Sequence, residues 1–322
     1  MKRQPLAAVL ILFAAILSAC SDPSLSVKKE PLRVAYTDWA GDYVTLIALK
    51  MGFFTEHGVT VDVVYYPTFS DSYIDLAIGK IDATSTVLID LLPSIRNNDL
   101  HAVMITDATD GMDSIVATPD IVTISDLRGK RIGVEFGTYA ELFASEMLAK
   151  ANLTRNDVTL VNISPDKVPS AIPDLIDAGH TWDPHTAEAL AKNNHIIFST
   201  AETPGFFPDV MTFRAEVLKS RPEDVRAFVA AWFEAADYWL TNPEAGNTII
   251  AQYTGMMVSD ITTEGIHIYN LQDNLQAFAE NPGSDYSSIY FVARKNLDFS
   301  IEAGYITTPP DLNIVIDPSF LK

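Results

Sequence analysis

Residues 32–105 show two alternating hydrophobic patterns along the chain. Short runs rich in β-branched and aromatic residues predict strands, and amphipathic stretches between them predict helices. The expected strands are 32–36, 59–66, 80–84 and 102–105, and the expected helices are 42–51, 72–78 and a segment ending near Leu92. Gly52 stands where a glycine would end the first helix. Strand and helix alternate, so we expect a largely parallel sheet with helices on its faces.

The same pattern restarts after residue 130. Strands are expected at 131–134, 158–161 and 195–198, and helices at 139–151 and 187–192. Three prolines between 165 and 173 leave that stretch unassigned. From Pro222 the apolar spacing is helical through Trp239, and Pro243 begins a further helix. Two α/β units followed by a helix-rich part indicate an α/β protein with two lobes, whose ligand would lie beyond the carboxyl ends of the strands.

The N-terminal residues have the features of a secretory signal. Lys2 and Arg3 precede an apolar run from Leu6 to Leu17, which is shorter than the roughly 20 residues that span a bilayer. The only cysteine of the chain, Cys20, follows this run, and its position resembles the lipobox of bacterial lipoproteins. The resemblance implies cleavage after residue 19, a lipid such as palmitate on Cys20, and a tether over residues 20–30. An ordinary secretory signal, or a buried N-terminal helix with a chance cysteine, remains the alternative.

The net charge and the absence of catalytic motifs from the sequence argue against several classes of function. The formal net charge of −20 argues against nucleic acid and anionic lipid surfaces as partners, since both require clustered Lys and Arg. Use of Cys20 for the anchor would leave no thiol for a disulfide. The nucleophile elbow of hydrolases, the zinc-protease helix, the phosphate-binding loop and the CxxC pair do not occur in the sequence, and its six histidines are scattered. We therefore expect neither an enzyme nor a metal site, and no cofactor.

Several motifs in order resemble the nitrate/sulfonate/taurine class of ABC-transporter substrate-binding proteins, which includes thiamine-pyrimidine precursor binders. They are Arg33-Val34-Ala35, Trp39, Gly52-Phe53-Phe54, Gly58-Val59, the run 125–134 with Gly137-Thr138, and Trp182-Asp183-Pro184. The resemblance implies a type II-like periplasmic-binding-protein fold. One lobe would comprise residues 31–106 and 212–322, and the other residues 107–211. The crossover segments would lie near 106–107 and 208–211.

The resemblance and the strand ends together select candidate ligand contacts. Asp38 and Trp39 follow the first strand, where the indole either stacks on a planar or cationic group or packs the loop. Gly137, Thr138 and Tyr139, preceded by Glu135, begin a helix whose free N–H groups either bind ligand oxygens or are capped by Thr138.

Further candidates come from the second unit and the expected crossovers. Trp182 matches an aromatic position that approaches the ligand in the family, and Asp183 either binds ligand or caps a helix. Ser85, Thr86 and Asp209 are polar residues at predicted strand ends. Asp110 is a candidate within the acidic run of Asp107, Asp110 and Asp113, although such a run is typically a solvated loop.

Taken together, the candidate segments contain many acids and no Lys or Arg. These segments are 37–43, 69–71, 83–86, 106–114, 135–141 and 181–184. Acids raise the electrostatic cost of binding a bare anion. The expected ligand is therefore a small nitrogen-containing molecule: a taurine-like zwitterion, an amine or a pyrimidine-type heterocycle.

The expected protein is a monomeric lipoprotein of the cell envelope. It would lie on the outer side of the cytoplasmic membrane or in the periplasm, and its partners would be an ABC permease and ATPase. A ligand-sensing lipoprotein, or less plausibly an enzyme on the same fold, is the alternative.

Overall fold

The computed structural model describes residues 29–95, 99–279 and 285–322. The chain divides into residues 1–30 and a unit that comprises Pro31–Lys322. The signal peptide, Cys20 and most of the expected tether lie outside the described residues. No helix within the described ranges is long and apolar enough to span a membrane.

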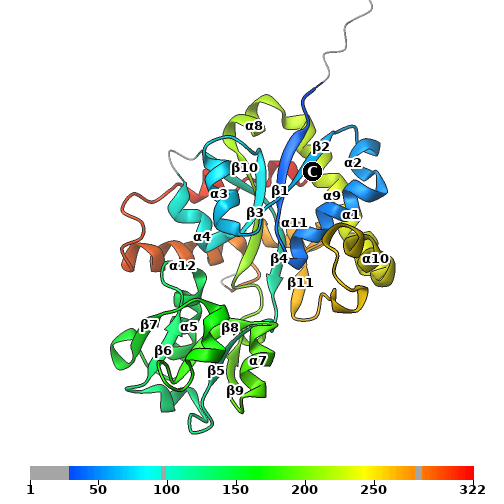
Figure 1. The fold of residues 1–322 in the computed structure, drawn as a ribbon. Coiled ribbons are helices and arrows are strands. Elements are labelled where there is room, and N and C mark those ends of the chain that lie inside the picture. Colours follow the sequence, from blue (N-terminus) through cyan, green and yellow to red (C-terminus); the bar gives the residue numbers. More distant parts are fainter. Residues whose placement is uncertain (1–28, 96–98, 280–284) are drawn as a thin grey trace, which may run out of the picture. The chain divides into compact units, whose positions relative to one another are not determined.

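The unit contains a larger sheet of six strands in the order β11-β4-β10-β3-β1-β2 (Figure 1). Its strands are β1 (Leu32–Tyr36), β2 (Val61–Tyr65), β3 (Ala83–Val87), β4 (Leu100–Thr109), β10 (Pro208–Arg214) and β11 (Ile266–Ile268). β1 is parallel to β2 and β3, but β10 is antiparallel to β3 and β4, and β11 is antiparallel to β4.

A smaller sheet of five strands has the order β7-β6-β8-β5-β9. Its strands are β5 (Asp113–Ala117), β6 (Arg131–Val134), β7 (Thr159–Asn162), β8 (Ala178–Trp182) and β9 (His195–Ser199). β6 is parallel to β7 and β8, whereas β5 is antiparallel to β8 and β9. The strands predicted from the sequence run in one direction within each sheet, as expected, but the unpredicted strands β5, β10 and β11 run in the opposite direction, so both sheets are mixed. Strands that cross between the sheets, such as β10, run against their neighbours.

Two segments connect the sheets. β4 ends at Thr109 and β5 begins at Asp113, and β9 ends at Ser199 before β10 begins at Pro208. Figure 1 shows β4 leaving the larger sheet toward β5. Residues near these crossings therefore lie where the two sheets approach each other.

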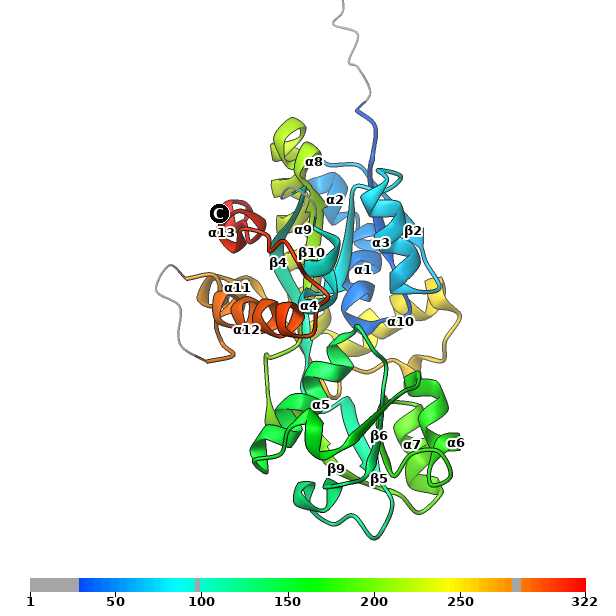
Figure 2. The ribbon, with the colours of Figure 1, turned by 90° about the vertical axis from the view of Figure 1, so that its left-hand side faces the viewer.

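The helices surround both sheets. The α-helices of the first half are α1 (Tyr43–Met51), α2 (Phe53–Glu56), α3 (Phe69–Ala77), α4 (Leu88–Leu91) and α5 (Tyr139–Lys150). They are followed by α6 (Val168–Ala171), α7 (His185–Ala191), α8 (Ala215–Ser220), α9 (Pro222–Thr241), α10 (Pro243–Thr254), α11 (Leu271–Ala277), α12 (Ile289–Glu302) and α13 (Leu312–Val315). In Figure 2, α11 and α12 lie to the left of β4 and β10, and α10 lies to the right of these two strands.

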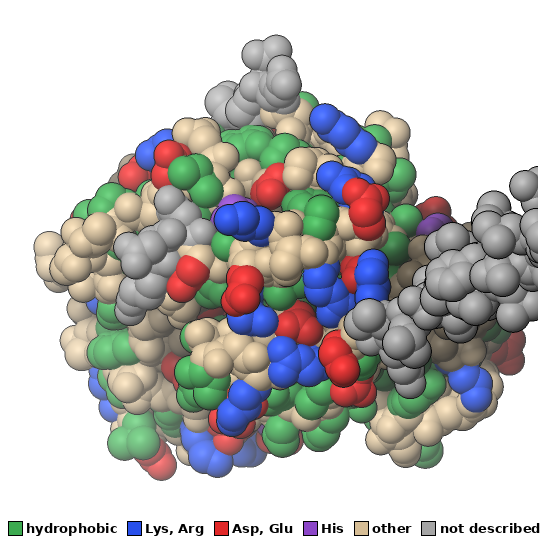
Figure 3. Space-filling model, turned by 90° about the horizontal axis from the view of Figure 1, so that it is seen from above, with side chains coloured by type: hydrophobic (Ala, Val, Ile, Leu, Met, Phe, Trp, Pro, Cys, Tyr) green, Lys and Arg blue, Asp and Glu red, His purple; other side chains and the backbone are tan. Residues whose placement is uncertain are grey.

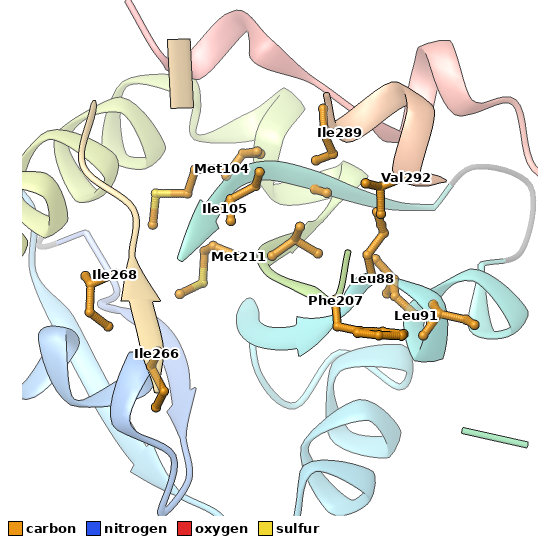
Figure 4. Close-up of a cluster of buried hydrophobic side chains, with 14 of the residues drawn as sticks. Leu88, Leu91, Met104, Ile105, Phe207, Met211, Ile266, Ile268, Ile289 and Val292 are labelled. Carbon is orange, nitrogen blue, oxygen red and sulfur yellow. The ribbon is translucent and has the colours of Figure 1, made fainter. Parts of the chain in front are cut away.

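Apolar packing fixes the elements that carry the site. Leu88 and Leu91 of α4 pack beside Phe207 and Val292 in a buried cluster around β4 (Figure 4). Val292 belongs to α12, so α4 is held between the strands and a helix that is distant in sequence. This packing leaves α4 little freedom to move, because buried side chains are close-packed.

The sequence patterns located most elements correctly. The first strand, the strand 131–134 and the helix that begins at Pro222 start where predicted, and Gly52 ends α1 in a left-handed conformation with φ 85°. β3 begins at Ala83 rather than Lys80, because residues 79–82 form a turn in which Asp82 binds Arg33. β5, β8, β10 and β11 were not predicted as strands.

Candidate ligand-binding site

Five aspartates gather at the carboxyl ends of the strands, where the two sheets approach each other. We call Asp42, Asp90, Asp107, Asp113 and Asp209 the aspartate cluster. Asp42 follows β1, Asp90 lies on α4 directly after β3, and Asp107 lies near the end of β4. Asp209 is the second residue of β10, and Asp113 is the first residue of β5. Each of these strands is antiparallel to its neighbours, so its first residues lie beside the carboxyl ends of the neighbouring strands β3 and β8. All but Asp90, which is partly buried, are fully buried.

The loop after β1 forms around Asp42. The backbone N–H and the hydroxyl of Thr37 both donate to Asp42 Oδ2, at 2.7 and 2.8 Å. Its Oδ1 atom is buried and has no hydrogen-bond partner within the described part of the chain. Burial raises the pKa of Asp42 to about 7, although the Thr37 hydrogen bonds oppose this shift, and the nearby Asp107 adds to it.

Asp107 and Asp209 face each other on β4 and β10 as cross-strand neighbours. Trp39 Nε1 donates to Asp107 Oδ1 at 2.8 Å, and Thr106 Oγ1 donates to Oδ2 at 3.0 Å. Burial raises the pKa of Asp107 to about 6, and burial together with Asp107 raises the pKa of Asp209 well above its ordinary value. Two carboxyl groups so close share a proton more readily than both ionise.

Gly41 allows the loop to approach this pair. A Cβ atom at residue 41 would lie only 1.8 Å from Asp107 Oδ2. Any other residue would therefore displace either the loop that carries Trp39 or the carboxyl group itself.

Tyr139 connects the larger sheet to the smaller one. Its backbone N–H donates to Asp90 Oδ1 at 3.0 Å, and its hydroxyl donates to Asp113 Oδ1 at 2.8 Å. His180 Nε2 lies 3.0 Å from the same Asp113 oxygen, and its ring lies 5.3 Å from the Tyr139 ring. Asp113 Oδ2 is buried, and no residue that the structure describes donates a hydrogen bond to it.

Among the described residues, the aspartate cluster is not paired with a Lys or Arg side chain. No ion pair or hydrogen bond made by the described residues brings a Lys or Arg to any of the five carboxyl groups. Within the same ranges, no group of three or more His, Cys, Asp or Glu side chains is arranged to hold a metal ion. Unpaired buried carboxyl oxygens of this kind can accept hydrogen bonds from an amine or a protonated heterocycle.

Comparison with known proteins identifies the family. Residues 38–246 match the NMT1/THI5-like family, which is more than half of the chain. The chain belongs to the NMT1/THI5-like family. This agrees with the resemblance drawn from Trp39 and the motifs that follow it.

Individual relatives agree with this assignment. A binding protein of Brucella abortus is 28% identical over 243 residues, which cover 73% of this chain and 75% of that protein. The periplasmic aliphatic sulphonate-binding protein of Escherichia coli has a TM-score of 0.69 and 17% identity, over 89% of this chain and 92% of that one. The desulfurization enzyme DSZB has a TM-score of 0.63 and 18% identity, over 91% of this chain and 98% of that one. The periplasmic-binding-protein fold expected from the sequence is confirmed.

Three of the residues that the sequence nominated as ligand contacts touch or belong to the aspartate cluster of this NMT1/THI5-like chain, namely Trp39, Tyr139 and Asp209. Ser85 and Thr86 are buried at the end of β3, where Ser85 Oγ lies 2.9 Å from Thr106 Oγ1 and Thr86 bonds the Tyr73 hydroxyl.

The other nominated residues make local contacts. Asp38 accepts from the Tyr65 hydroxyl at 2.6 Å and is exposed, and Asp183 accepts from Ala187 N at 3.3 Å. Trp182 is partly buried, with its ring 5.7 Å from that of His180. Asp110 is exposed between β4 and β5.

At the start of α5, the nominated residues bond within the chain. Thr138 Oγ1 donates to the carbonyl oxygen of Glu135 at 2.9 Å and accepts from Ala140 N at 3.3 Å. The N–H of Gly137 donates to Glu141 Oε2 at 2.8 Å.

The interpretation of the acidic run as a solvated loop was wrong for two of its members. Asp107 and Asp113 are 0% and 1% exposed, because each lies within a strand, and only Asp110 faces solvent. Sequence reasoning also missed Asp42, Asp90 and His180. Asp42 lay inside the segment 37–43, so the excess of acids without Lys or Arg was the signal that could have located it.

Proposed function

We propose that this chain is the solute-binding lipoprotein of an ABC importer. It would close two lobes, built on the larger and smaller sheets, on a small nitrogen-containing organic solute and deliver that solute to a membrane permease. The sulphonate-binding relative of the same fold, periplasmic by its name, supports the transport role and the location outside the cytoplasmic membrane.

The aspartate cluster carries the proposal for the ligand. Asp42, Asp113 and Asp209 each have a buried carboxyl oxygen to which none of the described residues donates a hydrogen bond. An ammonium, amidine or ring N–H group would donate to such oxygens and neutralise their charge, whereas a sulfonate or nitrate would add negative charge. An amine, a pyrimidine-type heterocycle or a taurine-like zwitterion is therefore the ligand class that fits.

Trp39 and Tyr139 supply the remaining recognition. The Trp39 indole is fixed by Asp107, and Tyr139 is fixed by Asp90 and Asp113. Both rings are thus preorganised beside the acids, where they can pack on a planar or cationic group.

A thermal-shift panel tests the ligand class. Purified protein is screened against amines, amidines, pyrimidines, taurine, alkanesulfonates and nitrate. We expect nitrogen bases to raise the melting temperature, since a ligand at 100 times its dissociation constant adds about 2.7 kcal/mol of stability. The Asp107→Asn/Asp209→Asn variant should lose at least tenfold in affinity for the best base. Stabilisation by nitrate or alkanesulfonates alone would contradict the proposal.

The anchor and the transport role have separate tests. Cys20→Ser should abolish palmitate labelling and release the protein from the membrane fraction. Isotope-labelled ligand should accumulate in cells only when both the chain and its permease are present. Chemical conversion of the ligand by purified protein would instead indicate an enzyme.

A further inference from the structure

The start of α5 is occupied by carboxylates of the chain itself. α5 has 12 residues, and the N–H groups at the start of such a helix attract negative charge. Asp90 Oδ1 accepts from the N–H of Tyr139 at 3.0 Å, and Glu141 Oε2 accepts from that of Gly137 at 2.8 Å. These are the groups with which a helix start would hold an anion.

The two carboxylates differ in their partners. Glu141 is a member of α5 and is neutralised by Arg155, whose Nη2 lies 2.8 Å from Glu141 Oε1. Asp90 comes from α4, beside the larger sheet, and accepts its hydrogen bond from the N–H of Tyr139 on another element. Glu141 therefore belongs to the structure of its own helix, whereas Asp90 reaches the helix from another element.

Packing holds Asp90 in this position. Its neighbours Leu88, Ile89 and Leu91 are all at least 96% buried, and α12 packs against α4 through Val292 (Figure 4). Because α4 cannot shift without opening this apolar contact, the carboxyl group stays aimed at α5.

The surroundings of Asp90 point to a ligand site. Tyr139, whose N–H binds Asp90, also binds Asp113. The Oδ2 atom of Asp113 is buried and has no hydrogen-bond partner in the described ranges. Asp209, similarly buried with an unpartnered oxygen, lies close enough for the charge of Asp90 to contribute to its raised pKa. Burial, opposed by the Tyr139 hydrogen bond, raises the pKa of Asp90 itself to about 7.

We infer that Asp90 is a specificity-determining residue that excludes anionic ligand groups by occupying the start of α5. The inference rests on the proposed function and narrows it. Of the ligands considered, it favours amines and neutral or cationic heterocycles over zwitterions that carry a sulfonate.

Removal of the carboxylate tests the inference. Methanesulfonate is titrated calorimetrically at pH 8 into the full mature chain and into Asp90→Ala. We expect Asp90→Ala to bind methanesulfonate at least tenfold more tightly than the unmodified protein, because the Tyr139 N–H is freed and one negative charge is lost. Asp90→Asn, which keeps a hydrogen-bond acceptor but loses the charge, should show a smaller gain.

Asp126→Ala is the matched control. Asp126 also accepts from backbone N–H groups, those of Val122 and Thr123, but on an exposed turn. This variant changes the net charge equally and should gain no affinity for methanesulfonate.

Equal methanesulfonate affinity of Asp90→Ala and the unmodified protein would overturn the inference. If Asp90→Ala does not fold, the same comparison with Asp90→Asn decides. The proposed function fails separately, if no amine or heterocycle of the panel binds the unmodified protein. The gain in methanesulfonate affinity of Asp90→Ala can be measured whether or not an amine or heterocycle binds the unmodified protein.

Discussion

Buried aspartates at the two ends of the strands in the larger sheet differ in their partners and in the direction of their pKa shifts. At the amino end, Asp82 precedes β3 and pairs with Arg33 Nη2 at 2.9 Å and Arg214 Nη2 at 3.1 Å. Burial alone would raise the pKa of Asp82, but the two arginines hold it below its ordinary value. At the carboxyl end, no described arginine pairs with Asp107 or Asp209, and the pKa values of both are raised.

The smaller sheet repeats the amino-end arrangement. Asp177 precedes β8 and pairs with Arg131 Nη2 at 2.8 Å, as Asp82 precedes β3 and pairs with Arg33. In both sheets the arginine stands in the first strand of a parallel unit, and its backbone N–H also donates to the aspartate. At the end of the molecule where the chain enters β1, Lys and Arg side chains lie intermixed with acids (Figure 3).

This difference separates structural acids from candidate ligand contacts. Pairing with arginine ties strands together, so the amino-end acids are explained by the fold. The carboxyl-end acids raise the cost of folding, and a cation from outside would offset it. Buried groups with perturbed pKa values are for this reason candidates for function.

The largest effect is expected at the amino end. Asp82→Ala should lower the free energy of unfolding by about 3 kcal/mol at pH 7, because it leaves two arginines without their shared carboxylate. Urea denaturation measures the loss. Affinity for the ligand should not change, and a variant as stable as the unmodified protein would remove the structural half of the comparison.

At the carboxyl end, substitution of the aspartates is expected to raise the free energy of unfolding rather than lower it. A raised pKa means that the folded state holds protons which the unfolded state has released, so stability falls as pH rises from about 4 through 6, the folded pKa of Asp107. Asp107→Asn/Asp209→Asn should therefore be more stable than the unmodified protein at pH 8, by about 2 kcal/mol. The difference should shrink toward pH 4. A variant that is destabilised at every pH would show that the pair is structural.

A smaller loss is expected in the smaller sheet. Asp177→Ala should lower the free energy of unfolding by about 1.5 kcal/mol, because Arg131 keeps its bonds to the carbonyl oxygens of Pro173 and Asp174. Urea denaturation of Asp177→Ala and Asp82→Ala under the same conditions compares the two losses of stability. A larger loss in Asp177→Ala than in Asp82→Ala would contradict the prediction.

The smallest effect is expected at the exposed pair of Lys130 and Asp120, whose atoms lie 3.2 Å apart. Lys130→Ala should leave the midpoint of urea unfolding unchanged, since exposed ion pairs contribute little. A clear shift of that midpoint would mean that ion pairing by itself, rather than pairing of a buried carboxylate, accounts for the stability loss expected in Asp82→Ala.

The sequence predicted the alternation of strands and helices because local hydrophobic spacing determines it. It did not predict the antiparallel strands β5 and β10, whose direction depends on the crossings between the sheets. Similarly, Trp39 and Tyr139 could be nominated from strand ends and family motifs, but Asp90 could not. Its role depends on the hydrogen bond between Asp90 on α4 and Tyr139 on α5, which lie 49 residues apart in the sequence.

The ionisation of the aspartates tests the account most directly. Carbon-detected NMR can follow each aspartate carboxyl carbon through a pH titration of the ligand-free protein. We expect a pKa of about 7 for Asp42 and of about 6 for Asp107, and a pKa below the ordinary value for Asp82. Titration of Asp42, Asp107 and Asp209 below pH 4, together with Asp82, would contradict the account.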